Sequence, residues 1–262
     1  MNKEKKKDTF GKILERYQYI LSNGDIVAGT VIHEEKKGFL VDIGTNTAGY
    51  LPKEEVAINL KKQNNEHLLL LNTTRDFFLI THNVNSQQYI ISIKRLDYIR
   101  AWKRIKQIYL EDIVFNLRIQ YLNRGGIITS LEGIQGFIPK SHISVINEEI
   151  NLTKNMHIKC KFLTTNENKN QLILSNKSAN LALSKHKFKL GELIYGKIMM
   201  LKSYGLFINI HNIKALLHVS EMGSINLNKI NTIFKIGSFI KVKVIHLNTK
   251  QGQVSVSFKN IK

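Results

Sequence analysis

At 262 residues the chain is longer than one small domain, and its hydrophobic share of 43% is enough to build buried cores. Its 39 Lys and Arg outnumber 20 Asp and Glu, and the net charge of +19 indicates a polyanionic partner, either nucleic acid or an anionic membrane surface. No apolar run approaches the roughly 18 residues of a membrane-spanning helix, and the single Cys160 excludes an internal disulfide and a cysteine-based zinc cluster.

The N-terminal residues 1–22 open with a Lys-rich stretch from Met1 to Lys7 and lack the apolar stretch of a secretory signal. This basic N-terminal segment is either a tail that touches the polyanionic partner or a frayed chain end. Heavy use of Ile, Asn and Lys along the chain also indicates an AT-rich genome, such as that of an organelle.

After this segment the chain repeats one pattern three times. The copies begin at residues 24, 111 and 191, continue with a glycine-led run at residues 38, 126 and 205, and then with a third run at residues 49, 136 and 215. The first two runs start 14 residues apart in the first and third copies and 15 apart in the second. Pro52 and Pro139 are the only prolines, and they occupy the same position of the first two copies.

Each copy ends in two β-type runs, at 77–83 with 89–94, at 158–165 with 172–175, and at 239–247 with 254–259. In the last pair apolar residues alternate with Lys or Ser, which predicts strands with one buried face. A short helix or turn after Pro52, Pro139 and His218 begins a longer excursion before these runs. The pattern predicts a mainly β protein with three tandem five-stranded barrels of the oligonucleotide-binding (OB) type, joined by helical linkers.

An amphipathic helix is predicted at residues 94–111, where five apolar residues recur every third position from Leu96 to Ile108. Two compatible interpretations remain open: the apolar stripe packs on a barrel, or the basic residues between also line a path for the polyanion. The predicted divisions are an N-terminal segment 1–22, a first repeat 23–95, a helical linker 96–110, a second repeat 111–176, a linker 177–189 and a third repeat 190–262.

The third copy, with Tyr204-Gly205-Leu206-Phe207-Ile208-Asn209 followed by Leu216-Leu217-His218-Val219-Ser220-Glu221-Met222, resembles the RNA-binding domain named for ribosomal protein S-one. The resemblance covers about residues 24–259, and the first two copies match it in glycines and strand pattern. The three-repeat length and the segment Lys94–Trp102 resemble the short plastid and cyanobacterial versions of this family.

This resemblance implies a small ribosomal subunit protein that binds single-stranded mRNA and helps present it to the ribosome during translation initiation. It implies single-stranded RNA and the small ribosomal subunit as partners, with no membrane partner and no small-molecule substrate. A plastid-encoded protein without a transit peptide is the expected source, and a bacterial cytoplasmic protein is the alternative.

The family pattern places Tyr204 and Phe207 on the exposed barrel face and His218 on the next strand, where rings can stack on bases. Asn248 and Gln253 stand where the family commonly has Asp and Arg, so the phosphate contacts are expected from Lys241, Lys243 and Lys259 instead.

The first two copies depart from this pattern. Lys37 and Gly125 replace the first ring, with Arg124 beside Gly125, and prolines replace the histidine. We therefore expect the third repeat to be the main stacking module. The first two repeats are expected to contact the RNA backbone through residues such as Lys37 and Arg124, or to dock onto the ribosome.

The alternatives to this interpretation are an RNA-processing enzyme, a non-ribosomal RNA-binding cofactor and a protein-docking scaffold. An RNA-processing enzyme would need clustered carboxylates or metal-ligand histidines, but the nine His are scattered, so we expect no catalytic residue, no metal and no cofactor. A non-ribosomal RNA-binding cofactor in transcription or decay, and a protein-docking scaffold, both remain open because the module is not tied to one pathway.

Overall fold

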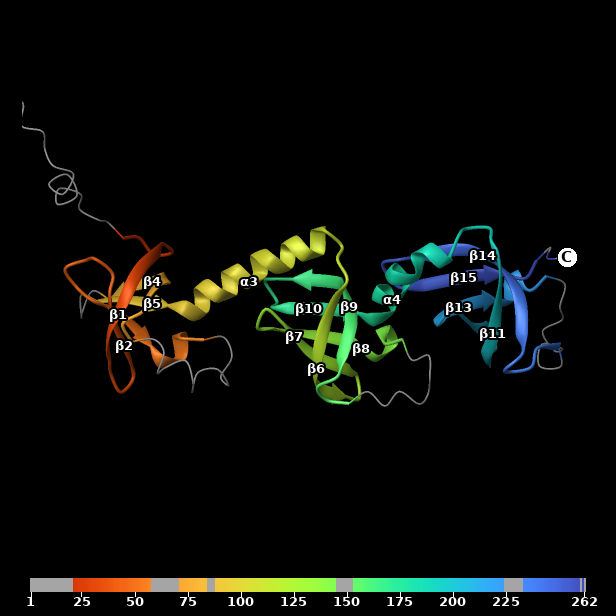
Figure 1. Cartoon of the computed structure of the whole chain (residues 1–262), viewed down its shortest axis with the longest axis horizontal. Coiled ribbons are helices and arrows are strands. Elements are labelled where there is room, and N and C mark those ends of the chain that lie inside the picture. The colour runs from red at the N-terminus through yellow and green to blue at the C-terminus, as the bar shows by residue number, and fades with distance from the viewer. Residues whose placement is uncertain are drawn as a thin grey trace, which may run out of the picture. The chain divides into compact units, whose positions relative to one another are not determined.

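The computed structural model describes residues 21–57, 71–83, 88–144, 153–223, 233–259 and 261. It contains three closed five-stranded barrels in chain order (Figure 1), which confirms the predicted fold class. The chain divides into two compact units, residues 1–101 with the first barrel and residues 102–262 with the second and third. The predicted N-terminal segment lies outside the described residues except for its last two positions.

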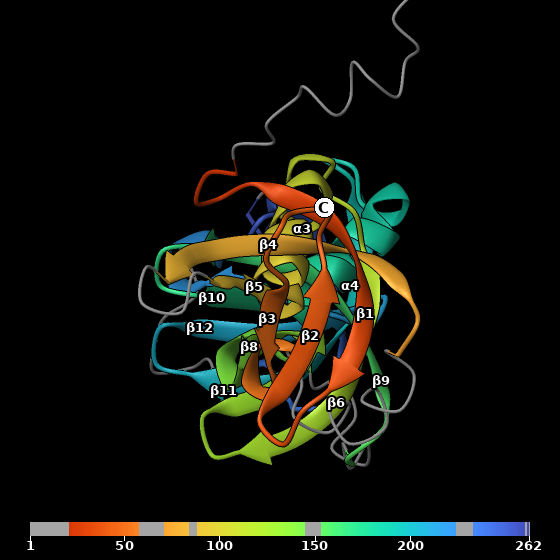
Figure 2. The same ribbon diagram turned by 90° about the vertical axis from the view of Figure 1, so that its left-hand side faces the viewer.

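The first barrel contains β1 (Ile26–Glu34), β2 (Gly38–Asp42), β3 (Gly49–Pro52), β4 (Thr74–Asn83) and β5 (Gln88–Ser92). Its strands close in the order β1-β2-β3-β5-β4 (Figure 2). The contact between β3 and β5 is parallel, and the other contacts are antiparallel. This order is that of an OB-type barrel, in which the excursion after the third strand carries the chain across to the fourth.

The other two barrels repeat this order. The second contains β6 (Phe115–Asn123), β7 (Gly126–Leu131), β8 (Ile134–Pro139), β9 (His157–Asn166) and β10 (Gln171–Ser175). The third contains β11 (Leu193–Lys202), β12 (Gly205–Ile210), β13 (Ile213–His218), β14 (Phe239–Asn248) and β15 (Gln253–Ser257). The runs predicted at 89–94 and 254–259 are shorter as strands, because β5 gives way to a helix at Ile93 and β15 ends at Ser257.

Single-turn helices follow the third strand of each barrel, as predicted after Pro52, Pro139 and His218. They are η1 (Lys53–Glu55), η3 (Lys140–His142) and η5 (Val219–Glu221). The rest of each predicted excursion, residues 58–70, 145–152 and 224–232, lies outside the described residues.

Strand alternation builds the cores. In the third barrel Leu206 and Ile208 of β12 point inward together with Val242 and Val244 of β14, and all four are buried. The first strand of each barrel pairs with the fourth strand at its beginning and with the second strand at its end, and the pairing with the second strand contains one register shift. Such a bulge bends the strand and lets a small sheet close on itself.

The glycine that opens the second strand of each barrel has a steric role. A Cβ atom at Gly38 would lie 2.5 Å from the Leu51 carbonyl oxygen on the facing strand, and Gly126 and Gly205 face the corresponding carbonyls of Ile138 and Leu217. Backbone cannot move aside as a flexible side chain can, so these positions exclude any side chain.

The predicted linker helix is α3 (Ile93–Leu110), which begins directly after β5. Ile93 joins the core of the first barrel, whereas Trp102 and Ile105 are buried in the second unit. Ile99 is 44% exposed, so the predicted apolar stripe is interrupted. A spacing of three residues turns each successive side chain about 60° around a helix, and one such stripe cannot stay on one face.

Several basic residues of α3 pair with neighbouring acids. Arg100 lies 2.6 Å from the Asp76 carboxylate in the first unit, and Arg104 lies 3.3 Å from Glu132 in the second. These pairs favour the interpretation that α3 packs on the barrels. Lys103 and Arg95 are exposed, and their contact with RNA stays a prediction.

The second linker contains α4 (Asn176–Ser184) and the single turn η4 (Lys185–Lys187). The Ser175 hydroxyl caps α4 by accepting a hydrogen bond from the Ser178 N–H at 3.1 Å. Leu181 joins the core of the third barrel, and the Ser178 hydroxyl donates to the Thr249 carbonyl at 2.6 Å. Within the described residues no helix is long and apolar enough to cross a membrane, and no three potential metal ligands cluster.

Candidate nucleic-acid interface

The outer face of β12 and β13 carries the predicted aromatic residues. Tyr204 directly precedes β12 and is 48% exposed, while Phe207 is half-buried between the inward-facing Leu206 and Ile208. The two rings meet edge to face, with centroids 6.0 Å apart and planes at 84°. A base can therefore stack on one ring while its neighbour contacts the other.

A lysine that sequence reasoning missed lies over this face. The Lys214 ammonium is 4.0 Å from the centroid of the Phe207 ring, on the adjacent strand β13. Lys177 of α4 adds charge nearby, and its pKa is lowered by burial first and by Lys214 second. The signal for Lys214 was its outward position two residues before Leu216, the residue opposite Phe207.

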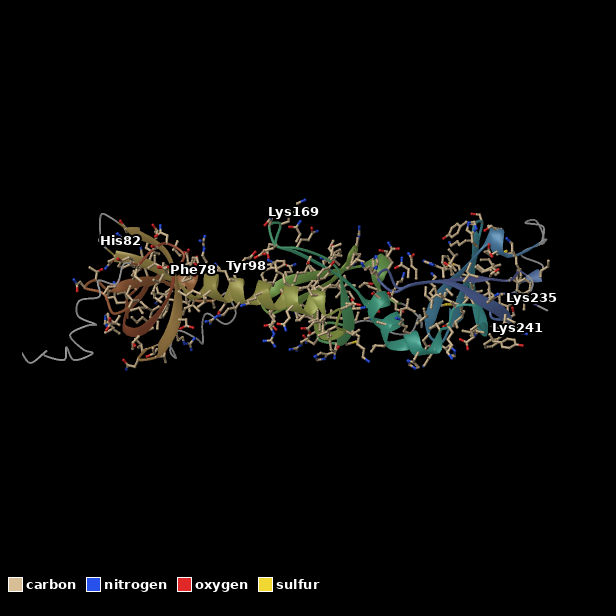
Figure 3. All side chains as sticks on the ribbon, turned by 90° about the horizontal axis from the view of Figure 1, so that it is seen from above. Phe78, His82, Tyr98, Lys169, Lys235 and Lys241 are labelled. Carbon is tan, nitrogen blue, oxygen red and sulfur yellow. The ribbon has the colours of Figure 1, made fainter. Side chains whose placement is uncertain are left out.

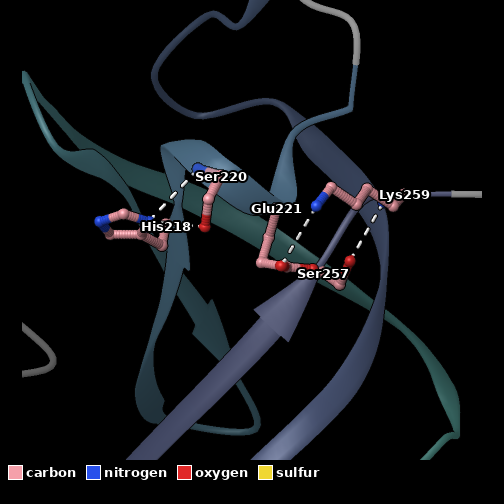
Figure 4. A network of polar contacts seen from close by, with 5 residues as sticks. All are labelled: His218, Ser220, Glu221, Ser257 and Lys259. Atoms are coloured by element: carbon pink, nitrogen blue, oxygen red, sulfur yellow. Dashed lines mark hydrogen bonds and ion pairs between the residues drawn. The ribbon is translucent and has the colours of Figure 1, made fainter.

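His218 ends β13 and is exposed beside the same face. Its Nδ1 accepts a hydrogen bond from the Ser220 backbone N–H at 3.2 Å and lies 2.8 Å from the Ser220 hydroxyl (Figure 4). An accepting Nδ1 places the proton of the neutral ring on Nε2. The turn of η5 thus fixes the ring and leaves one N–H donor for a base or a phosphate.

Lys259, which is predicted to contact a phosphate, already has an acidic neighbour in the structure. Its ammonium lies 3.4 Å from the Glu221 carboxylate, across η5 from His218 (Figure 4). The Ser257 hydroxyl and Lys259 lower the pKa of Glu221, which keeps this carboxylate charged. Lys259 therefore ties the last strand to η5, and part of its charge is already neutralised.

The predicted polar pair at the β14–β15 turn has a local structural role. Asn248 and Gln253 are opposite each other at the strand ends, and the Asn248 side chain accepts a hydrogen bond from the Gln251 N–H at 3.1 Å. Asn166 does the same for Lys169 in the second barrel. These amides shape the turns, and their contact with RNA stays a prediction.

Lys241 and Lys243, also predicted to hold phosphates, are not gathered at the Tyr204 face. Both lie on β14 and pair with β11, where Lys241 is opposite Tyr195 and Lys243 is opposite Leu193. The structure thus separates the predicted residues into a ring face on β12 and β13 and a lysine-bearing face on β11 and β14.

In the first two barrels the position of Tyr204 is held by Lys37 and Gly125. The three residues are structurally equivalent, because each accepts a backbone hydrogen bond from the first residue of the following helical turn. Lys37 and Arg124 are both exposed there, as a phosphate contact requires.

Position-by-position comparison missed two rings in these barrels. Tyr50 on β3 is opposite Leu40, and Phe137 on β8 is opposite Ile128, so each ring occupies the strand across from the position of Phe207. Both rings are half-buried and lie over the glycine that opens the second strand. Each barrel therefore places an aromatic ring on the same outer face, but on different strands.

Closed five-stranded barrels with aromatic rings and cations on one outer face define an OB-type nucleic-acid-binding protein. A family model for the S1 RNA binding domain matches residues 21–75, 114–177 and 187–259, and the chain belongs to this family.

Relatives that match nearly the whole chain are proteins of the small ribosomal subunit. The chain is 46% identical over 253 residues to the small ribosomal subunit protein bS1c of Porphyra purpurea, covering 97% of this chain and 95% of that protein. It is 45% identical over 255 residues to bS1c of Pyropia yezoensis, with the same coverage. It is 36% identical over 254 residues to bS1A of Synechocystis, covering 97% of this chain and 77% of that protein.

Proposed function

We propose that the chain is a small ribosomal subunit protein that binds single-stranded mRNA and helps present it to the ribosome during translation initiation. Three repeats of an RNA-binding family support this function, as do full-length relatives named for the small subunit. The net charge of +19 supports a polyanionic partner, and the repeat limits predicted above stand as the proposed domains.

The face built by Tyr204, Phe207, Lys214 and His218 carries this proposal. It combines two rings at 6.0 Å, an ammonium 4.0 Å from one of them and an imidazole fixed by Ser220. Stacking on rings accepts every base, and ammonium groups hold the backbone, so this face suits varied mRNA leaders.

The proposed setting is the translation system of a plastid. Red-algal bS1c proteins and a cyanobacterial bS1A support it, because they are similar to this chain over nearly its whole length. The proposed role is binding and includes no catalytic step, in keeping with relatives named as ribosomal proteins.

The test compares the full chain with its Tyr204→Ala/Phe207→Ala/His218→Ala variant in binding to oligouridylate at two salt concentrations. Stacking is worth about 1–3 kcal/mol per base, so affinity is expected to fall at least about tenfold. The salt dependence is expected to persist, because the lysines are unchanged.

A Tyr204→Phe/Phe207→Tyr variant retains both rings and is the matched control. Equal affinity of the triple variant and the original chain would refute the stacking face. Co-sedimentation of the full chain with small ribosomal subunits tests the ribosomal part separately, and failure to co-sediment would favour a non-ribosomal RNA-binding role.

A further inference from the structure

The paired strands β11 and β14 present a second surface on the third barrel. Leu193, Tyr195 and Lys197 alternate outward on β11, while Ile194 and Gly196 face the core. On β14 the outer residues are Phe239, Lys241 and Lys243. The register places Tyr195 opposite Lys241 and Lys197 opposite Phe239, so each ring has a lysine as its direct neighbour.

The two rings of this surface are unusually exposed. Tyr195 is 67% exposed and Phe239 is 70% exposed, both more than Tyr204 at 48%. Neither β11 nor β14 contains an acidic residue. Lys241 projects from β14 at the outside of the barrel (Figure 3). Exposed aromatic rings favour a partner with flat apolar faces. The neighbouring lysines, with no acidic residue on either strand, favour an anionic partner.

The spacing of the rings suits a nucleic-acid strand. Tyr195 and Phe239 are diagonal neighbours, and diagonal positions across an antiparallel pair are about 7–8 Å apart. Two successive bases of an extended strand can reach rings at this separation. Lys197 and Lys241 stand at the other two corners of the same square, where they can contact the backbone phosphates.

The barrel fold does not require these rings. The register assigns Ala28 and Thr74 to the corresponding corners of the first barrel, and Asn116 and His157 to those of the second. All three barrels close in the same strand order although these side chains differ. The exposed pair of six-membered rings is therefore a property of the third barrel, not a packing need shared by the repeats.

This surface is distinct from the ring face on β12 and β13. Residues 193–197 of β11 pair with β14, residues 197–202 pair with β12, and the register with β12 shifts between Ile198 and Met200. Tyr195 lies before this shift, whereas Met200 after it is opposite Phe207. A bulge in β11 thus lies between Tyr195 and the residue opposite Phe207.

We propose that the outer face of β11 and β14 is a second binding surface for single-stranded RNA, with Tyr195 and Phe239 stacking on bases and Lys197, Lys241 and Lys243 holding phosphates. The proposal shares the RNA-binding class of the proposed function, but it does not depend on the Tyr204 face.

The test uses the full chain and a Tyr195→Ala/Phe239→Thr variant, which carries the residues of the first barrel at these two positions. A Tyr195→Phe/Phe239→Tyr variant keeps both rings, and Ile26→Ala removes an exposed apolar residue from the corresponding strand of the first barrel. The ligand is an oligouridylate of about 30 nucleotides, because each OB-type barrel covers about 4–16. Affinity is measured, and photo-crosslinked peptides are identified by mass spectrometry.

The expected result is a fall in affinity of about tenfold for Tyr195→Ala/Phe239→Thr and little change for both controls. Crosslinks to the peptides of Tyr195 and Phe239 are expected to persist when Tyr204, Phe207 and His218 are all alanine, which separates this surface from the first. Unchanged affinity together with the absence of crosslinks on β11 and β14 would overturn the proposal. Loss of ribosome co-sedimentation with unchanged RNA affinity would also overturn it, in favour of a protein-docking face.

Discussion

Gly125 and Gly126 are neighbours in the chain, but a methyl group added at each meets different surroundings. At Gly125 the nearest heavy atom would be a Phe137 ring carbon at 3.7 Å, an ordinary contact. At Gly126 the methyl would overlap the Ile138 carbonyl oxygen and lie 3.0 Å from the carbonyl carbon. Because these atoms belong to the facing backbone, Gly126→Ala must push β7 and β8 apart.

The cost of such overpacking is typically about 1–3 kcal/mol, so we expect opening of the second barrel to become about 5–150 times more frequent in Gly126→Ala. Gly125→Ala is expected to change it by less than about twofold, because the added methyl fits.

The protein contains its own reporter for this opening. Cys160 is the only cysteine and lies fully buried on β9 of the second barrel. Burial raises the pKa of its thiol to about 12, so the folded barrel holds almost no reactive thiolate near neutral pH. Alkylation by iodoacetamide therefore measures the fraction of open barrel.

The alkylation rate of Cys160 should rise in Gly126→Ala by the factor given above and remain near the original rate in Gly125→Ala. Equal rates in the two variants would refute the steric argument, whichever direction both moved. Rapid alkylation of the unchanged protein would refute the assignment of Cys160 to a closed core.

Phe137→Ala should weaken oligouridylate binding of the full chain by about fivefold or more, because a stacking ring is lost. Ile128→Ala on the facing strand should weaken binding less. A binding titration in which Ile128→Ala has the larger effect would contradict stacking on Phe137. Glu221 has a lowered pKa in the folded protein, so its stabilising contribution is present above the ordinary carboxyl range and is lost as pH falls through the folded value. Melting temperatures of Glu221→Gln and the original chain should therefore differ at neutral pH and converge in acid, and a constant difference would exclude this role. Trp102→Ala should lower the free energy of unfolding of the second unit by about 3–5 kcal/mol, because Trp102 is buried. Denaturant unfolding measures this loss, and Ile99→Ala, at an exposed position of the same helix, is the control. Equal losses of unfolding free energy in the two variants would contradict the burial of Trp102 in the helix packing.

Local patterns predicted the barrels because each strand carries its own evidence. Period-two alternation marked β14 and β15, and the repeated glycine-led runs marked the second strands. Comparison of the three copies helped, because a run whose strand pattern is weak in one copy has a clear strand pattern in another. The steric reason for Gly126 was not accessible, because it depends on a carbonyl of another strand.

The candidate site was less predictable because it depends on neighbours across strands. Tyr50 and Phe137 were missed because each lies opposite the position where a ring was sought. Lys241 and Lys243 are predicted from the sequence to contact phosphates, but the sequence does not show that β14 is on the far side of β11 from β12 in the closed order. Sequence shows that a residue points outward, whereas only the closed barrel shows in which direction.

The bulge in β11 between Ile198 and Met200 has a consequence for how the third barrel handles RNA. Because it lies between Tyr195 and the residue opposite Phe207, an RNA segment held on β12 and β13 leaves the proposed surface on β11 and β14 open to a second segment. Capture of one segment then raises the effective concentration of the other, and the gain depends on the length of RNA between them. A barrel of this kind would act as a bivalent clamp that favours long, unpaired leaders over short oligonucleotides.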